Sequence, residues 1–139
     1  MKTSFILTTI LISIIVMATF GLLYGLNFWR IQNSGHITTV NILADHDVLY
    51  WGIVDPNSTN YHDVVFTNTG NKAVNLSMIV GNWNPIDASL YLTCSWNYTS
   101  EIVQPSGSIP IAFILNVSPN IKNITDFSFD ITVYGTTTS

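Results

Sequence analysis

Basic residues are scarce in this sequence of 139 residues. It has four Lys and Arg against eight Asp and Glu, and only 9% of its residues are charged. After residue 30 the cations are Lys72 and Lys122. Binding to nucleic acid requires clusters of Lys and Arg that neutralise phosphates, so this composition excludes a nucleic-acid partner. Ser, Thr and Asn supply the polarity instead, which we interpret as the surface of an exterior coat or a crowded assembly.

Cysteine is nearly absent, since Cys94 is the only one. One thiol cannot form a disulfide within the chain, so a hydrophobic core has to stabilise the domain. Cys94 lies in the apolar run YLTCSW (91–96), where we expect a small buried side chain on a strand. An intermolecular disulfide is the alternative.

Catalytic motifs are also lacking. The chain has neither a G-x-S-x-G elbow nor a glycine-rich phosphate loop. The segment Asp45-His46-Asp47 offers possible metal ligands, but its composition is typical of a solvated loop, and His36 and His62 lie far from it in sequence. A copper site is excluded because no His or Met closely follows Cys94. We therefore predict a non-enzymatic protein without catalytic residues, a metal site or a cofactor.

The longest feature of the chain is a run without charge, from Thr3 to Trp29. Its densest part, Phe5 to Leu26, is long enough as a helix to cross a hydrocarbon core of roughly 30 Å. Aromatic residues and Arg30 end the run, as at the border between a membrane helix and the lipid headgroups. We predict a transmembrane anchor over residues 1–30. A cleaved secretory signal ending near Ala18 is the alternative, but the apolar sequence after Ala18 favours a retained anchor.

Two glycines in this run, Gly21 and Gly25, form a small-xxx-small pair that lets membrane helices approach closely. They motivate a hypothesis of self-association in the membrane. The sequence after Arg30 has few cations to hinder export. We therefore expect a single-pass protein of the cell membrane, in contact with lipid, whose soluble domain is extracellular.

Five N-x-S/T sequons support this location, because they act as glycan acceptors only in an exported domain. Their asparagines are Asn57, Asn75, Asn97, Asn116 and Asn123.

The sequence after the anchor predicts a single all-β domain. A short linker (31–36) precedes a domain at 37–135, and residues 136–139 form a tail. Runs of branched and alternating residues predict seven or eight strands that form two antiparallel sheets packed face to face. The expected strands are 37–43, 48–54, 61–67, 73–80, 90–96, 101–104, 109–117 and 127–133. Between them we expect a tight hairpin at 68–71, a crossover at 81–89 with one helical turn near 86–89, and a loop at 118–125.

The alternation also predicts which side chains point inward. They are Val64 and Phe66; Val74, Leu76, Met78 and Val80; Ile109, Ile111, Phe113, Leu115 and Val117; and Phe127, Phe129, Ile131 and Val133.

Four segments, WGIVDP (51–56), VVFTNTGN (64–71), NWNP (82–85) and FSFDITV (127–133), resemble a family of small archaeal surface proteins. The resemblance covers nearly all of residues 37–135. It implies an N-terminal membrane helix followed by an immunoglobulin-like β-sandwich. The family usually has a Pro-Gly turn before two strands, and this chain departs from that pattern at 55–58 and 105–108. No functional residue carries over, because the family has no catalytic motif.

We consider three functions. The first is a structural, scaffolding or accessory module that binds a surface-layer, filament or membrane-complex protein, with an edge strand as the favoured mode of contact. The second is a subunit of an extracellular filament, in which strand 37–43 completes a neighbouring sandwich after cleavage of the N-terminal segment. The third is an accessory domain that binds glycan or metal, with Trp83 and Trp96 able to stack on sugars, although a core role is commoner for such residues.

Overall fold

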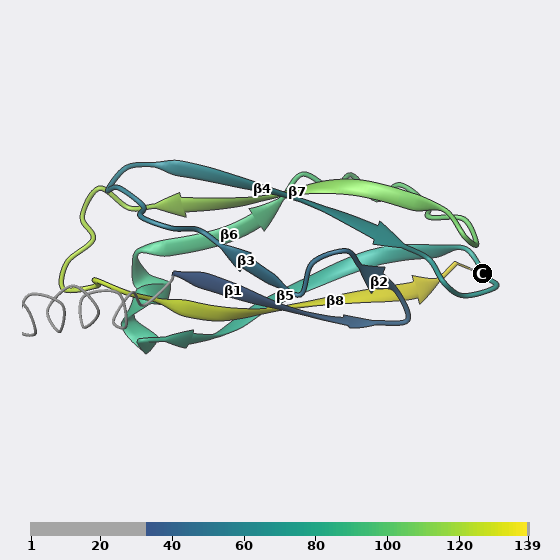
Figure 1. Ribbon diagram of the computed structural model, residues 1–139, viewed down its shortest axis with the longest axis horizontal. Helices are drawn as coiled ribbons and strands as arrows, with labels where there is room; N and C mark the ends of the chain where they lie inside the picture. The colour runs from purple at the N-terminus through teal and green to yellow at the C-terminus, as the bar shows by residue number, and fades with distance from the viewer. Residues whose placement is uncertain (1–32, 139) are drawn as a thin grey trace, which may run out of the picture. The chain divides into compact units, whose positions relative to one another are not determined.

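The computed structural model describes residues 33–138 of the chain (Figure 1). They form eight strands and one short 3₁₀ helix, η1. The elements are, in order, β1 (Ser34–Val40), β2 (Leu43–Ala44), β3 (Val48–Tyr50), β4 (Thr59–Thr67), β5 (Val74–Asn84), η1 (Ile86–Leu90), β6 (Leu92–Trp96), β7 (Ser108–Val117) and β8 (Ser128–Thr137).

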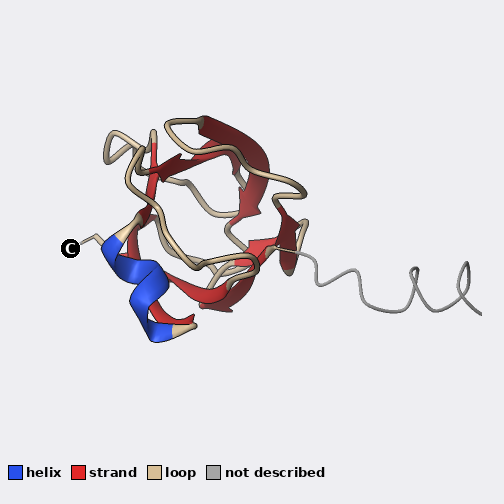
Figure 2. Ribbon diagram, turned by 90° about the vertical axis from the view of Figure 1, so that its left-hand side faces the viewer, coloured by secondary structure: helices blue, strands red, loops and turns tan. Residues whose placement is uncertain are grey.

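The strands form two four-stranded sheets. Sheet A has the strand order β3-β1-β8-β5, and sheet B has the order β2-β4-β7-β6. Figure 2 shows strands on all sides of a common interior, with η1 at the periphery. The predicted all-β architecture of two facing sheets is confirmed.

The pairing of the strands differs from the expected one in two respects. Strands β1 and β8 run parallel, from Ser34 opposite Ser128 to Val40 opposite Tyr134. The other neighbouring strands are antiparallel, as predicted. Consecutive strands β7 and β8 lie in different sheets, whereas the last two strands of an immunoglobulin domain share one sheet. The wholly antiparallel arrangement is therefore wrong for one pair, and the strand order is not the immunoglobulin order.

The inward side chains of β7 and β8 form the centre of the core. Phe113, Leu115, Ile131 and Val133 are fully buried, and Phe129 is 1% exposed. Burying each such side chain stabilises the fold by about 1.5–3 kcal/mol. The inward faces predicted for these two strands are thus confirmed, except that Ile109 is only half-buried.

Strand β5 is longer than predicted and less buried at its centre. Val74 and Leu76 are buried as expected, whereas Met78 and Val80 are only half-buried. β5 is an edge strand, and the segment that bonds to it, through Tyr98 and Val103, reaches only Leu76 and Val74. The strand continues to Asn84 with a register shift after Gly81, where we expected a crossover. The helical turn expected after it is present as η1.

The first predicted strand is divided in two. β1 begins at Ser34, within the predicted linker, and ends at Val40. Asn41 then adopts a left-handed conformation (φ 60°), and the chain passes to β2 in sheet B. The next strand, β3, ends at Tyr50 instead of residue 54, shortly before Gly52 turns the chain with φ 63°.

Three further boundaries differ from prediction. The connection at 68–71 is not a hairpin, because β4 belongs to sheet B and β5 to sheet A. Segment 101–104 contributes only an isolated bridge between Val103 and Val74. β8 extends to Thr137, two residues beyond the predicted end of the domain.

Within residues 33–138, no helix has the length and apolar character needed to cross a membrane. The predicted transmembrane segment, with Gly21 and Gly25, lies outside the described residues.

Candidate glycan acceptors and contact surface

Asn33 organises the end of the sandwich at which the described chain begins. Its side chain donates to the carbonyl of Gly52 (2.8 Å) and accepts from the N–H of Phe127 (3.0 Å). Its carbonyl accepts from the N–H of Trp51 (2.8 Å). These bonds hold the first strand, the end of β3 and the start of β8 together. Sequence reasoning placed Asn33 in the linker, because one buried asparagine carries no pattern.

Two of the predicted glycan acceptors lie in loops near this end. Asn57 is exposed at the third position of a turn closed by a bond from Ser58 N–H to the Asp55 carbonyl (3.2 Å). Its φ of 60° is the left-handed conformation that a type II turn requires there. Asn123 is exposed and left-handed as well (φ 58°), in the loop between β7 and β8. Figure 1 shows that loop at the same end as the start of β1.

The other three acceptors are held by sheet structure. Asn75 lies on β5 opposite Thr136, and its side-chain oxygen is buried. Asn116 lies on the central strand β7, and its side-chain oxygen accepts from the Thr59 hydroxyl (2.9 Å). Asn97 extends the ladder of β6, since its backbone N–H and its side-chain oxygen both bond to Ala112. The five sequons are therefore not equivalent in the folded domain.

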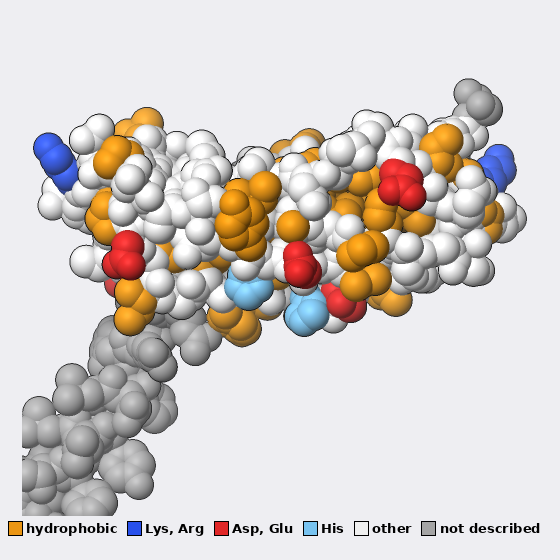
Figure 3. Space-filling view, turned by 90° about the horizontal axis from the view of Figure 1, so that it is seen from above, with side chains coloured by type: hydrophobic (Ala, Val, Ile, Leu, Met, Phe, Trp, Pro, Cys, Tyr) orange, Lys and Arg blue, Asp and Glu red, His pale blue; other side chains and the backbone are white. Residues whose placement is uncertain are grey.

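The outer face of sheet B carries a row of apolar side chains that we call the contact strip. It comprises Leu43, Tyr61, Val65, Pro110 and Ile114. Tyr61 is opposite Ile114, Val65 is opposite Pro110, and Leu43 lies beside them opposite Thr67. Leu43 is 57% exposed and Tyr61 is 65% exposed. Figure 3, seen from the side of β4 and β7, shows hydrophobic groups among uncharged polar, acidic and histidine groups, with cationic groups only at the two ends of this view.

The outer face of sheet A is more polar. Cross-strand neighbours there pair Ser34 with Ser128 and Thr38 with Thr132. Asn82 donates to the carboxylate of Asp130 (2.7 Å) on the same sheet. The large exposed apolar residues of this face, Tyr50 (56%) and Ile79 (57%), are on its two opposite edge strands. They do not form a continuous row.

The opposite end of the sandwich contains an open hollow of about 260 Å³, and three asparagines, Asn41, Asn68 and Asn71, are among the residues that line it. Asn68 is fully buried in its wall. Its side chain donates to the carbonyls of Lys72 (2.8 Å) and Val103 (3.0 Å) and accepts from Gly70 N–H (3.0 Å). These bonds satisfy the polar groups of the connection between the sheets, so Asn68 has a structural role.

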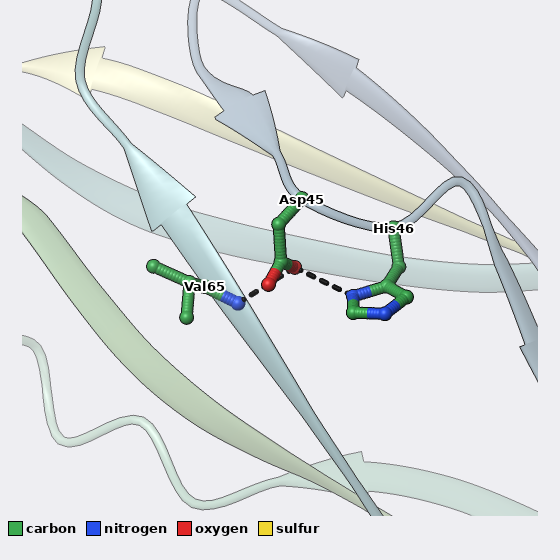
Figure 4. A network of polar contacts seen from close by, with 3 residues as sticks. All are labelled: Asp45, His46 and Val65. Atoms are coloured by element: carbon green, nitrogen blue, oxygen red, sulfur yellow. Dashed lines mark hydrogen bonds and ion pairs between the residues drawn. The ribbon is translucent and has the colours of Figure 1, made fainter.

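The Asp45–His46 pair, considered above as a source of metal ligands, also has a structural role (Figure 4). One carboxylate oxygen of Asp45 lies 2.8 Å from Nδ1 of His46 and accepts from the N–H of Val65 at 2.9 Å. Desolvation opposes ionisation of Asp45, but these two hydrogen bonds lower its pKa below the usual value. Asp45 thereby links the end of β2 to β4 through a hydrogen bond. The described residues contain no group of three His, Cys, Asp or Glu that could hold a metal ion.

Cys94 and the two tryptophans considered for sugar binding contact the interior. Cys94 is half-buried on β6, and burial raises the pKa of its thiol to about 12. Trp83 stacks on Phe129 with ring centroids 4.3 Å apart. Trp96 packs against Phe113 (6.1 Å) and Tyr98 (5.2 Å). Both tryptophans are half-buried and pack against the core.

A scan against models of protein families and a search of curated proteins found no match for this chain. The resemblance to archaeal surface proteins thus stays a prediction.

Proposed function

We propose that this protein is a membrane-anchored extracellular module that acts by contact, as a structural or accessory subunit of a surface assembly. The observation that carries the proposal is the contact strip on sheet B. Its five apolar residues lie on one outer face of β2, β4 and β7, interrupted on β4 by Asp63, and include two large, mostly exposed side chains. Exposed apolar side chains grouped on one face are costly in water and typically mark a site of protein–protein contact.

The chemistry of the strip indicates the kind of partner. Leu43 and Tyr61 supply aliphatic and aromatic surface, and Asp63 lies within the same face between Tyr61 and Val65. A partner would match this surface with an apolar patch that includes a hydrogen-bond donor or a cation for Asp63. Complete burial of a large apolar side chain contributes about 1.5–3 kcal/mol, so the strip can supply a substantial part of a binding energy.

The uncharged run from Thr3 to Trp29 supports the anchor. In this proposal the family resemblance applies to the general layout only: a membrane helix followed by a sandwich with an immunoglobulin-like size and two sheets. A module of this kind needs no catalytic residue or cofactor.

The test compares two double variants of the full-length protein in its own cells. Leu43→Ser with Tyr61→Ser removes the exposed apolar groups of the strip. Tyr50→Ser with Ile79→Ser removes a tyrosine and an aliphatic residue of similar exposure from sheet A. Surface cross-linking of intact cells, followed by quantification of the cross-linked species, measures contact.

We expect the strip variant to lose cross-linked product about tenfold or more, because a loss of 1.4 kcal/mol corresponds to a factor of ten in affinity. The sheet A variant should retain it. Equal loss in both variants, or no cross-linked product with the wild type, would overturn the proposal.

The filament hypothesis is supported by one observation. β1 is the first strand of the domain, and its long partner is β8, which it follows in parallel over seven residue pairs. A terminal strand of this kind can be exchanged between copies without threading the chain. Its departure would, however, separate β3 from the rest of sheet A.

A further inference from the structure

We infer that Asn57 and Asn123 are the glycan acceptors of the folded domain and that Asn75, Asn97 and Asn116 are not modified. This inference rests on the extracellular location in the proposed function. It concerns a covalent modification, in which an oligosaccharyltransferase of the cell uses a lipid-linked oligosaccharide as donor. The amide nitrogen Nδ2 forms a bond to C1 of the first sugar, while the bond from C1 to the lipid phosphate breaks. The phosphate leaves with the electron pair, and one amide proton passes to a base.

The transferase must bind the asparagine and the hydroxyl residue two positions later as a short peptide. A sequon in a sheet can reach such a cleft only after its ladder hydrogen bonds break. Each intramolecular hydrogen bond contributes about 0.5–1.5 kcal/mol, and a buried polar group left without a partner costs more. The conformation of each sequon therefore determines how readily it is modified.

Asn123 meets this requirement best. It lies in the loop between Val117 and Ser128, the ends of the two flanking strands. Its side chain is exposed, and the hydroxyl of its sequon, Thr125, bonds only to the neighbouring carboxylate of Asp126 (3.0 Å) among the described residues. This single exposed bond is easily replaced by a bond to the enzyme.

Asn57 is the second acceptor. Its turn projects the side chain from the surface, and Asn is favoured at this left-handed position. The sequon hydroxyl, Thr59, is on the first residue of β4. It donates to Asn116 (2.9 Å), and strand ends open at low cost.

The other three sequons cannot readily bind the transferase as a short peptide, each for a different reason. Asn116 is paired on both sides, with Thr59 of β4 and Thr93 of β6, so two ladders would have to open together for it to be modified. Asn75 is paired with β8, and its side-chain oxygen is buried. Asn97 is followed by Tyr98, whose hydroxyl accepts from Leu76 N–H (3.0 Å) and donates to the Glu101 carbonyl (2.6 Å).

This selection leaves the contact strip uncovered. Asn116 is two residues from Ile114 on the same outer face of β7, so a glycan there would lie over the strip. Asn57 and Asn123 instead lie in loops at the end of the sandwich that contains Asn33. Val117 N–H donates to the carbonyl of Ser58 (2.9 Å) and joins their two loops. The two glycans would project from that end of the sandwich and leave the outer faces of both sheets uncovered.

The experiment uses the full-length protein from its own membranes, with an epitope tag after Ser139. Intact-mass and glycopeptide mass spectrometry are applied to the wild type, Asn57→Gln, Asn123→Gln and the double variant. Asn41→Gln and Asn120→Gln are matched controls, because both asparagines are exposed and neither is in a sequon. Asn41 also shares the left-handed conformation of the two acceptors.

We expect each single variant to lose one glycan mass, the double variant to lose both, and the controls to lose none. Thr125→Ala should have the same effect as Asn123→Gln, and Thr125→Ser should restore the glycan. Glycan on Asn75, Asn97 or Asn116, or a double variant that keeps its glycans, would overturn the inference.

Antibody labelling of the tag on intact cells separates this result from the proposed function. A labelled tag on a protein without any glycan refutes the acceptor assignment and leaves the extracellular module standing. An unlabelled tag that becomes accessible only after the cells are opened refutes the proposed location, and the acceptor assignment with it.

Discussion

At the scale of single residues, half-buried Cys94 gives the domain a defined response to alkaline pH. Burial raises the pKa of its thiol to about 12, whereas an unfolded chain exposes a thiol of pKa about 8.5. A raised pKa in the folded state means that the folded protein binds the proton more tightly. The corresponding stability is fully present below pH 8.5 and is lost as pH rises toward 12.

We therefore expect the free energy of unfolding of the wild type to fall more steeply above pH 8.5 than that of Cys94→Ala. Urea denaturation of both proteins at pH 7.5 and at pH 10 measures the difference, and the titration of Lys and Tyr cancels because it is common to both. An equal fall in the free energy of unfolding between pH 7.5 and pH 10 in the two proteins would show that the thiol is as accessible as in the unfolded chain. As a second readout, a thiol reagent at pH 8 should react slowly with the folded wild type and rapidly in urea.

The candidate site illustrates what single residues reveal before the structure is known. The five sequons are visible as motifs, but their ranking depends on partners that are distant in sequence. Thr59 and Asn116 are 57 residues apart and share a hydrogen bond (2.9 Å). Asn33 and Asn68 are buried and hold loops in place, and each is preceded or followed by ordinary polar residues. Nothing local distinguishes them from exposed asparagines.

At the scale of elements, the sequence predicts best where one face is buried and the strand is straight. β7 and β8 alternate strictly, and their inward residues are the predicted ones. Predictions are poorer where one residue redirects the chain. Asn41 divides a continuous run of branched residues by adopting a φ of 60°, which asparagine tolerates but does not require. The extension of β5 through Trp83 is explained by stacking on Phe129, a long-range contact that alternation cannot encode.

Gly35 on β1 permits a close approach between the first and last strands. A Cβ atom at this position would lie 3.0 Å from Cζ of Phe129, which is nearly fully buried. A Cβ at Gly81, on the edge strand β5, would have no atom within 4 Å. We expect Gly35→Ala to lower the free energy of unfolding by about 1–3 kcal/mol through overpacking.

Gly81→Ala is the matched control. It should change stability little or raise it, since alanine restricts the unfolded chain more than glycine does. Urea midpoints of both variants provide the measurement. Equal effects of the two substitutions would show that β1 does not pack against Phe129 as described.

At the scale of the whole molecule, the order of the strands is the part that the sequence could not provide. Alternation shows which face of a strand is buried, but it does not show which strand lies beside it. The parallel pairing of β1 with β8 joins residues nearly a hundred positions apart, as in Ser34 and Ser128. The alternating runs and short turns led to the expectation of antiparallel neighbours throughout, and this one pair is parallel instead.

The parallel pairing also allows the two leading functions to be separated with the isolated domain. Residues 32–139 form a compact unit by themselves, and their core lies between the two sheets. We expect the fragment 33–139 to fold cooperatively without the preceding residues and to remain a monomer from micromolar to millimolar concentration. Analytical ultracentrifugation and urea denaturation of this fragment provide the measurement.

Strand exchange predicts a different outcome for the same fragment. If β1 passes between copies, each sandwich stays complete only in a dimer or a chain of subunits, so the mass must rise with concentration. Gly35→Ala would then weaken assembly, because the donated strand meets Phe129 of the recipient in the same geometry. Gly81→Ala would leave assembly unchanged. A concentration-dependent mass that Gly35→Ala alone reduces would favour the filament subunit. A monomer with both substitutions would leave the contact strip as the surface through which the protein acts.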